Sequence, residues 1–395
     1  MSALQSMKSV LLGTFLCALT FFAGPVAAAY KVTLLLPTDD TRLERARIER
    51  GALGHAGGPV LDALKVALAE GKLELDAAGA ALELDVVTVN DATSARAAAA
   101  KAHKAGAAAL LTDLPAAWTL AAADAAPVPL LNLGASDDNL RQADCRRNLF
   151  HLNLSERMRA DALAQTLTAR RWTQVLMLTG PLPGDIERVA TAQAALRRYG
   201  LKLVASKPFK LSADPRERDL ANPLLLTASS GGAAYDVVWV VDSDGEFAAS
   251  LPYRTALPRP VVGDGGLVAV AWSPKFDRFG APQVTRRLTK AVGRPMGAHD
   301  WPAWLAGKAL VSAAVAMPKG TAAAFAKALA EVEVDGSKGV LMSFRTWDGQ
   351  LRQPVMLSDG QGVAALAPGD GVLHPKNNLD TLGADGPEKL CKARQ

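Results

Sequence analysis

The chain has 395 residues, 49% of them hydrophobic, and a net charge of +5 at pH 7. At roughly 150 residues per domain this length predicts two domains. Lysine and arginine are dispersed among aspartate and glutamate, and no basic stripe is interleaved with aromatic residues, so the composition argues against a nucleic-acid-binding protein.

The N-terminus has the pattern of a secretory signal peptide. Lys8 precedes a 13-residue apolar core, residues 10–22, and small residues end the segment at Ala27, Ala28 and Ala29. The apolar core is too short to span a bilayer. We therefore expect residues 1–29 to be removed, which leaves 366 residues and lowers the net charge to +4, because Lys8 is the one charged residue lost.

After Tyr30 the pattern alternates between strand and helix. The expected strands are residues 31–36, 82–89, 107–111 and 128–133. The expected helices are residues 43–70, 94–106 and 118–126. Continuous apolar strands that alternate with helices predict a parallel sheet covered on both faces. The glycine-rich residues 51–58 interrupt the first helix rather than form a phosphate loop, because they do not follow a strand directly.

A second series of elements begins after His151. The first is a helix over residues 156–171 with Ser155 as its N-cap. The further expected strands are residues 173–178, 201–205, 236–241 and 260–262. The further expected helices are residues 186–199, 283–292 and 300–317. The pattern favours an α/β protein with two doubly wound parallel-sheet lobes in tandem.

The C-terminal part carries the most specific pattern. In SFRTWDGQLRQPVML, residues 343–357, Asp348 and Gly349 stand between two strand-like runs and predict a hairpin in which both turn residues have positive φ. The motif VLHPKNNLDTLG, residues 372–383, follows, and then PEKLC, which ends at Cys391.

These motifs, with residues 145–167, 251–272 and 299–310, resemble one group of proteins. The chain is similar to type I periplasmic substrate-binding proteins of ABC transporters, which are related to branched-chain amino acid receptors. Within them it resembles the subgroup associated with PQQ-dependent alcohol dehydrogenase systems. The resemblance implies a monomeric periplasmic receptor without a cofactor, which is not an enzyme and whose partners are a small ligand and an inner-membrane ABC permease.

The resemblance also implies that the chain crosses between the lobes three times, at a hinge. With crossings near residues 150–154, 270–273 and 340–344, lobe one comprises residues 30–150 and 274–339. Lobe two comprises residues 151–273 and 340–375, and residues 376–395 form a C-terminal tail across the surface.

Ligands of open α/β sheets bind beyond the carboxyl ends of the strands. The loops expected there are rich in acids, namely Asp39, Asp40, Asp113, Asp137, Asp138, Asp185, Asp242, Asp244, Glu246 and Asp264. From these loops we take as candidate ligand-binding residues Asp113, Trp118, Ala135, Ser136, Asp137, Asp185, Asp242 and Asp264. Asp137, Asp185, Asp242 and Asp264 are expected to converge between the lobes, with Ser136 as a hydroxyl partner and Trp118 as an apolar wall.

The resemblance to amino acid receptors suggests an amino acid as the ligand, whereas the acidic residues of the loops suggest a cation. Residues 115–117 lack the hydroxyls expected in such receptors, although Gly134, Ala135 and Ser136 keep their small-residue loop. A carboxylate-rich cleft would favour an organic ammonium or a hard metal ion. The alternative is that these acids are helix caps, a common role of aspartate at such loops. The five histidines show no metal-ligand spacing, and no metal site is expected.

Cys145 and Cys391 remain after removal of the signal peptide. In an oxidising compartment they are expected to form a disulfide that attaches the tail to the first lobe. The alternative is two unrelated thiols.

Two functions stay open. One is a solute receptor that closes on a ligand by hinge motion and delivers it to the permease. The other is a sensor or scaffold of the alcohol oxidation system that has lost its ligand, with PQQ-dependent alcohol dehydrogenase components as partners. An exported hydrolase is a poor third, because no Gly-x-Ser-x-Gly motif is present.

Overall fold

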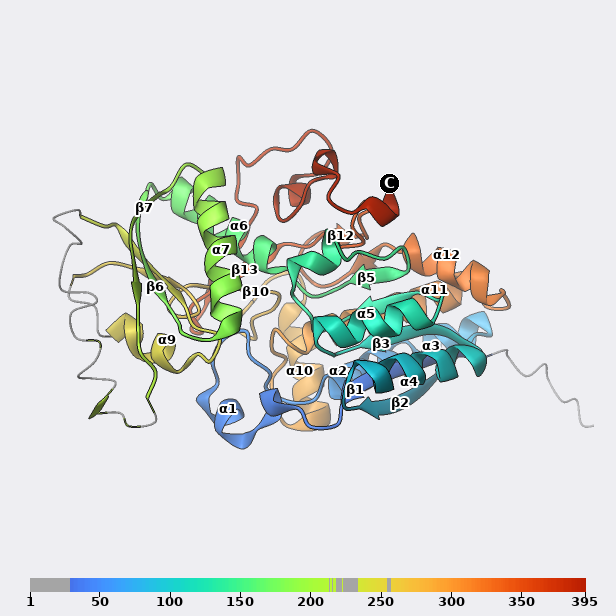
Figure 1. Cartoon of the computed structure of the whole chain (residues 1–395). Coiled ribbons are helices and arrows are strands. Elements are labelled where there is room, and N and C mark those ends of the chain that lie inside the picture. Colours follow the sequence, from blue (N-terminus) through green and yellow to red (C-terminus); the bar gives the residue numbers. More distant parts are fainter. Residues whose placement is uncertain (1–28, 213, 215, 218–221, 223–233, 254–256) are drawn as a thin grey trace, which may run out of the picture.

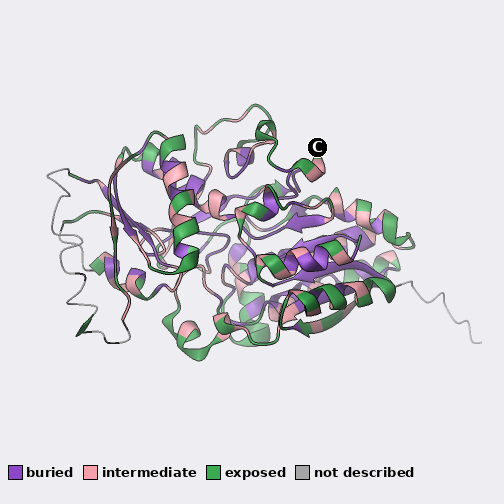
Figure 2. Ribbon diagram, in the orientation of Figure 1, coloured by how far each residue is buried: buried purple, intermediate pink, exposed green. Residues whose placement is uncertain are grey.

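The computed structural model describes residues 29–212, 214, 216–217, 222, 234–253 and 257–395, so the expected signal peptide lies outside the described residues. The chain forms two α/β lobes side by side, and the C-terminal segment runs along one side of both (Figure 1). The strands are mostly buried, and the outer faces of the helices are exposed (Figure 2).

The first lobe is built on a five-stranded parallel sheet of order β2-β1-β3-β4-β5. Its strands are β1 (Ala29–Pro37), β2 (Ala81–Val89), β3 (Ala107–Thr112), β4 (Leu130–Asn132) and β5 (Leu149–His151). One face is covered by α2 (Val60–Glu70), α3 (Lys72–Ala78), α11 (Trp301–Ala316) and α12 (Ala322–Ala330). The other face is covered by α4 (Ala92–Lys104) and α5 (Ala116–Ala125).

Alternation along β1 explains why both faces are covered. Val32 and Leu34 pack in the cluster that contains α2 and α11, whereas Leu35 packs in the cluster that contains α4 and α5. Successive side chains of a strand point to opposite faces, so a run of apolar residues must be buried on both.

The second lobe is built on a four-stranded parallel sheet of order β7-β6-β8-β9. Its strands are β6 (Gln174–Thr179), β7 (Lys202–Pro208), β8 (Val237–Val241) and β9 (Val261–Gly263), and its helices are α6 (Glu156–Ala169), α7 (Pro183–Arg198) and α9 (Glu246–Ser250). An antiparallel sheet follows, formed by β10 (Val268–Val270), β13 (Val355–Ser358) and β14 (Val363–Ala367). Ser155 caps α6 as predicted, because its hydroxyl accepts from the amide of Met158.

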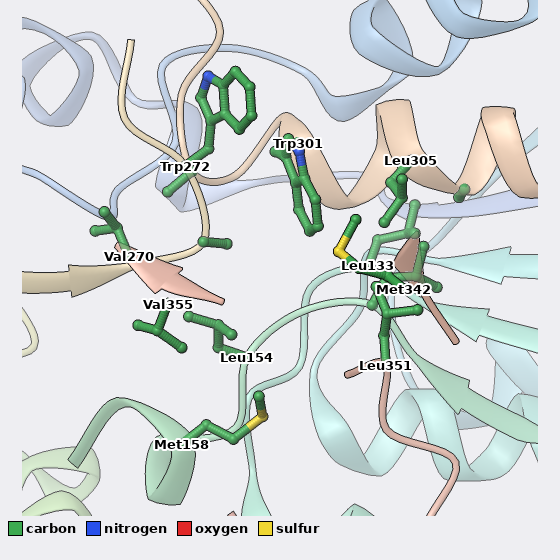
Figure 3. Close-up of a cluster of buried hydrophobic side chains, with 14 of the residues drawn as sticks. Leu133, Leu154, Met158, Val270, Trp272, Trp301, Leu305, Met342, Leu351 and Val355 are labelled. Atoms are coloured by element: carbon green, nitrogen blue, oxygen red, sulfur yellow. The ribbon is translucent and has the colours of Figure 1, made fainter. Parts of the chain in front are cut away.

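Three connections join the lobes. β5 leads to α6, β10 leads to α10 (Ala281–Val292), which packs on α2, and β12 (Leu341–Met342) leads to β13. Apolar side chains fill the space around these connections, among them Leu154, Val270, Trp272, Trp301 and Leu351 (Figure 3). One continuous core therefore runs from the helices of the first lobe into the second. The residue limits given above for each lobe stay a prediction.

Two local predictions are confirmed only in part. The helix expected over residues 43–70 is divided into a 3-10 turn (Thr41–Leu43), α1 (Arg45–Arg50) and α2. Gly51, with φ of +60°, ends α1, because glycine adopts this left-handed conformation without steric cost. The segment between α1 and α2 is a loop, in agreement with the interruption expected at residues 51–58.

The hairpin predicted at Asp348 and Gly349 is the second. The antiparallel pairing is present, because the amide of Arg345 donates to the Gln350 carbonyl and the amide of Arg352 to the Ser343 carbonyl, both at 2.9 Å. Only Gly349 has positive φ, at +71°, so the conformation expected of Asp348 is wrong. Asp348 is 2% exposed, and its carboxylate accepts from the amide of Gln350. A second hairpin follows, between β13 and β14. The Asp348 turn is buried at a crossing, so tertiary contacts decide its conformation.

His151, at the end of β5, is buried in a single protonation state. Its Nδ1 lies 3.0 Å from the Asn132 amide nitrogen, which can only donate, and its Nε2 lies 3.1 Å from the Leu140 carbonyl, which can only accept. The neutral Nε2–H tautomer satisfies both contacts. Burial lowers the pKa of His151 well below its ordinary value, and the charges of Arg141 and Arg394 lower it further.

We therefore expect His151 to make stability depend on pH. A depressed folded pKa means that stability is fully present above the unfolded pKa of about 6.5 and is lost as pH falls toward the folded pKa. Between pH 7 and pH 5, urea unfolding should show a loss of about 1–2 kcal/mol that His151→Asn removes. The exposed His103 supplies the control, His103→Asn, which should keep the loss. An unchanged pH profile in His151→Asn would contradict this assignment.

The C-terminal tail contacts both lobes. Cys391 is bonded to Cys145, with Cα atoms 5.6 Å apart, inside the range expected for a disulfide. The Arg394 guanidinium donates to the Leu149 carbonyl at 2.7 Å. Glu388 pairs with Arg157 of α6, at 2.7 Å. The tail is thus attached to the end of the first sheet and to the first helix of the second lobe.

The disulfide closes a separation of 246 residues, so it restricts the unfolded chain strongly. We expect Cys391→Ser to lower the free energy of unfolding by about 2–4 kcal/mol, measured with urea. The double variant with Cys145→Ser should match the single one. Non-reducing peptide mass spectrometry of the protein isolated from an oxidising compartment should recover one linked pair, and two free thiols would refute the pairing.

Candidate ligand-binding site

A cavity of about 320 Å³ lies where the carboxyl ends of both parallel sheets meet. The first lobe contributes Arg42 after β1, Ser136 after β4 and His299 before α11. The second lobe contributes Arg188 of α7, Trp239 of β8, and Asp264 after β9. The loop between α1 and α2 adds Leu53, Gly54, His55 and Ala56. The volume is near the lower end for ligand pockets, which suits a small molecule.

Two of the eight predicted ligand-binding residues, Ser136 and Asp264, line this cavity. The other six, which do not, are Asp113, Trp118, Ala135, Asp137, Asp185 and Asp242. Trp118 packs with the apolar residues of α4 and α5 instead. Ala135 is buried and bonds to Asn132, and Asp137 is exposed at the start of a 3-10 turn.

Asp113 lies just behind the cavity wall and holds two residues that line it. Its carboxylate is 2.8 Å from Arg42 Nη1 and 3.1 Å from His299 Nε2. Burial alone would raise the pKa of Asp113, but His299 and Arg42 outweigh it and hold the pKa well below its ordinary value. Gly134 makes room for this carboxylate, because a Cβ there would lie 2.1 Å from Asp113 Oδ1. Asp113 is therefore an ionised positioning group.

Asp185, Asp242 and Asp264 do converge, at one edge of the second sheet. Asp264 accepts from the amide of Asp242 at 2.7 Å, and Asp185 accepts from the amide of Ser243 at 2.7 Å. Asp242 accepts from the amide of Ala248 at 2.8 Å, which caps α9. These carboxylates bond the loops to one another. The capping alternative therefore describes Asp185 and Asp242, and the prediction of a cleft lined by many carboxylates is wrong.

Arginine side chains dominate the polar part of the wall. Arg188 pairs with Asp264 and, at 3.1 Å, with Glu156 of α6. Arg159 lies one turn after Glu156 on the same helix. Burial lowers the pKa of Arg159, and Glu156 offsets only part of this effect.

An ion-pair cluster joins the two lobes beside the cavity. Arg47 and Arg50 of α1 lie 3.3 Å and 2.8 Å from the carboxylate of Asp244, in the loop after β8. His55 approaches the same loop, since a Cβ at Gly245 would lie 3.1 Å from its ring. These contacts hold the segment after β1 against the second lobe, as expected of a closed cleft.

Five residues of the cavity wall are not among those predicted from the sequence, namely Arg42, His55, Arg159, Arg188 and His299. His55 lies in the glycine-rich residues 51–58, which were interpreted as a helix interruption alone. The arginines Arg159 and Arg188 lie on helices, and their spacing differs little from that of solvent-exposed arginines. Of these residues, His55 could have been predicted, because a histidine in a glycine-rich loop is a signal of a binding site.

Within the described part of the chain, no three histidine, cysteine, aspartate or glutamate side chains come together as a metal site. The helices of that part include none with the length and apolar character needed to cross a bilayer.

No protein-family model and no curated protein matches the sequence. Solved structures do match. A periplasmic binding protein from Burkholderia mallei has a TM-score of 0.67 and 14% identity, over 93% of this chain and 99% of that one. The chain has the fold of type I periplasmic binding proteins.

Two further structures have the same fold at similarly low identity. The leucine-, isoleucine-, valine-, threonine- and alanine-binding protein from Brucella ovis, in a closed conformation, has a TM-score of 0.65 and 13% identity, over 84% of this chain and 89% of that one. A solute-binding protein of an ABC transporter from R. palustris, in complex with benzoate, has a TM-score of 0.60 and 16% identity, over 88% of this chain and 100% of that one. At these identities the similarity establishes the fold.

The structural role of Asp185 can be separated from a binding role. Asp185→Ala removes the acceptor of two loop amides, those of Leu182 and Ser243, and should lower the free energy of unfolding by about 1–3 kcal/mol. Asp137→Ala, at an exposed position, is the control and should change it by less than about 0.5 kcal/mol. Urea denaturation measures both. Equal effects of the two substitutions would contradict the assignment of Asp185 as a loop cap.

Proposed function

We propose that this chain is the solute-binding component of an ABC transporter and that it closes on a small ligand between its lobes. The observation that carries the proposal is the cavity, whose wall is built from the strand ends of both sheets. A ligand there contacts both lobes at once and so stabilises the closed form. The fold is shared with the leucine-, isoleucine-, valine-, threonine- and alanine-binding protein from Brucella ovis and with the benzoate-bound solute-binding protein from R. palustris.

The remaining parts of the proposal rest on the sequence. The pattern of residues 1–29 supports export to the periplasm, and the fold supports delivery of the ligand to an inner-membrane permease. The resemblance of the C-terminal motif, residues 372–383, supports a role in a PQQ-dependent alcohol oxidation system.

A strain that lacks this protein should then grow poorly on alcohols that PQQ-dependent enzymes oxidise. Normal growth on these alcohols would refute the link.

Ligand-induced closure distinguishes a receptor from a scaffold. We expect the radius of gyration, measured by small-angle scattering, to fall when a member of a panel of small acids, amino acids and amines binds. Asp244→Asn weakens the contact with Arg47 and Arg50 and should reduce affinity about twofold to fivefold. Asp277→Asn, at an exposed position, should bind as the wild type does. A chain that binds but does not compact, or binds none of the panel, is not a receptor of this kind.

A further inference from the structure

The carboxylates at the cavity already have cationic partners. Asp264 is paired with Arg188, and Glu156 is 3.1 Å from the same guanidinium. Asp113, behind the wall, is held by Arg42 and His299. An ammonium ligand would have to compete with these guanidinium groups for every acceptor. The described acids of the wall therefore offer little to a cation.

Arg159 is in the opposite situation. Its Nη1 donates to the Ala269 carbonyl at 3.2 Å, and its Nη2 makes a long contact of 3.4 Å with the Asn153 side-chain oxygen. Its Nε is buried without a hydrogen-bond partner and lies 3.9 Å from Glu156 Oε1, beyond hydrogen-bond range. A guanidinium has five N–H donors and stays charged in proteins. Arg159 thus brings a positive charge and unused donors to the cavity.

Glu156 is not available to Arg159 as a counterion of its own. Its carboxylate is shared with Arg188, whose Nε it contacts more closely. A buried charge without a close counterion is unfavourable, and an anion that accepts from it removes this cost.

Part of the wall is apolar. Leu163 of α6, Trp239 of β8 and Val268 of β10 line the cavity beside Arg159. Such walls favour a ligand with an apolar body, because burying that body releases water from both surfaces.

We propose that the cavity binds a small organic carboxylate, whose anionic group is held by the guanidinium of Arg159 and whose apolar body packs against Trp239 and Leu163. This inference rests on the proposed function, since it names the ligand class of the same site. It replaces the organic ammonium or metal ion expected from the sequence.

The test compares ligands that share an apolar body and differ in the charge and hydrogen-bonding groups of the head group. Isothermal titration calorimetry is run with benzoate, benzamide and benzylamine, and with 4-methylpentanoate, 4-methylpentanamide and 4-methylpentylamine. We expect the carboxylate of each set to bind most tightly. This comparison uses the wild-type protein, so it does not depend on the folding of a variant.

Three variants assign the effect to Arg159. Arg159→Gln should weaken binding of the carboxylate by about tenfold to a hundredfold. Arg159→Lys should recover part of the affinity, and Arg197→Gln, at an exposed position of α7, should leave it unchanged. Circular dichroism and melting temperature establish that each variant is folded.

The outcomes separate the two claims. Tighter binding of an amine or amide than of the matching acid would overturn the carboxylate inference and leave the receptor function intact. Wild-type affinity for the acid in folded Arg159→Gln would do the same. Binding of no probe in either set would overturn the carboxylate inference, and binding of no member of the wider panel of small acids, amino acids and amines would overturn the proposed function as well.

Discussion

The crossings between the lobes depend on a buried polar network centred on Gln350. Its amide donates to the carbonyls of His151 and Asn153, at 3.2 Å and 3.0 Å, and its oxygen accepts from Arg141 Nε at 2.8 Å. Gln353 donates in the same way to the carbonyl of Leu152. Backbone carbonyls at a buried crossing must be satisfied, and the isolated bridge between His151 and Gln350 supplies part of this, because the Leu351 amide donates to the His151 carbonyl at 2.9 Å. These side chains bind one crossing to another and thereby set where the two sheets meet.

The position of the cavity follows from where the two sheets meet. Loops from both sheets are brought together, and their aspartates are used mainly to hold the loops in place. Gly263, with φ of +109°, permits the turn that directs Asp264 back to the amide of Asp242, because a Cβ there would lie 2.1 Å from the Val240 carbonyl. Arginines from α6 and α7 then provide the polar face. The cavity combines one under-paired guanidinium with an apolar part of the wall, which suits the carboxylate ligand that we propose.

Most of the fold could be predicted because the signals are local. The strand LLL of β1 and the run VVWVV of β8 are apolar along their whole length, as buried parallel strands are. Ser155 and Gly51 mark helix ends through the chemistry of caps. The positive φ expected at Asp348 is wrong because the hairpin closes between Arg345 and Gln350, over a longer loop than the two-residue turn that Asp-Gly favours.

The site was less predictable than the fold, because the role of each polar residue depends on contacts with residues that are distant in the sequence. An aspartate after a strand has the same sequence signature whether it caps a loop, as Asp185 does, or lines a cavity, as Asp264 does. Arg159 is separated from a surface arginine only by its distance from Asn153 and Ala269, which depends on how β10 packs on α6. The partners that decide the chemistry lie about 110 residues apart in the chain.

A crystal structure of the protein with benzoate or 4-methylpentanoate bound tests the central claim most directly. The account predicts density for the ligand between the two sheets, with its carboxylate oxygens at hydrogen-bond distance, about 2.7–2.9 Å, from the Arg159 guanidinium. A ligand bound outside this cavity, or one whose carboxylate points away from Arg159, would contradict it.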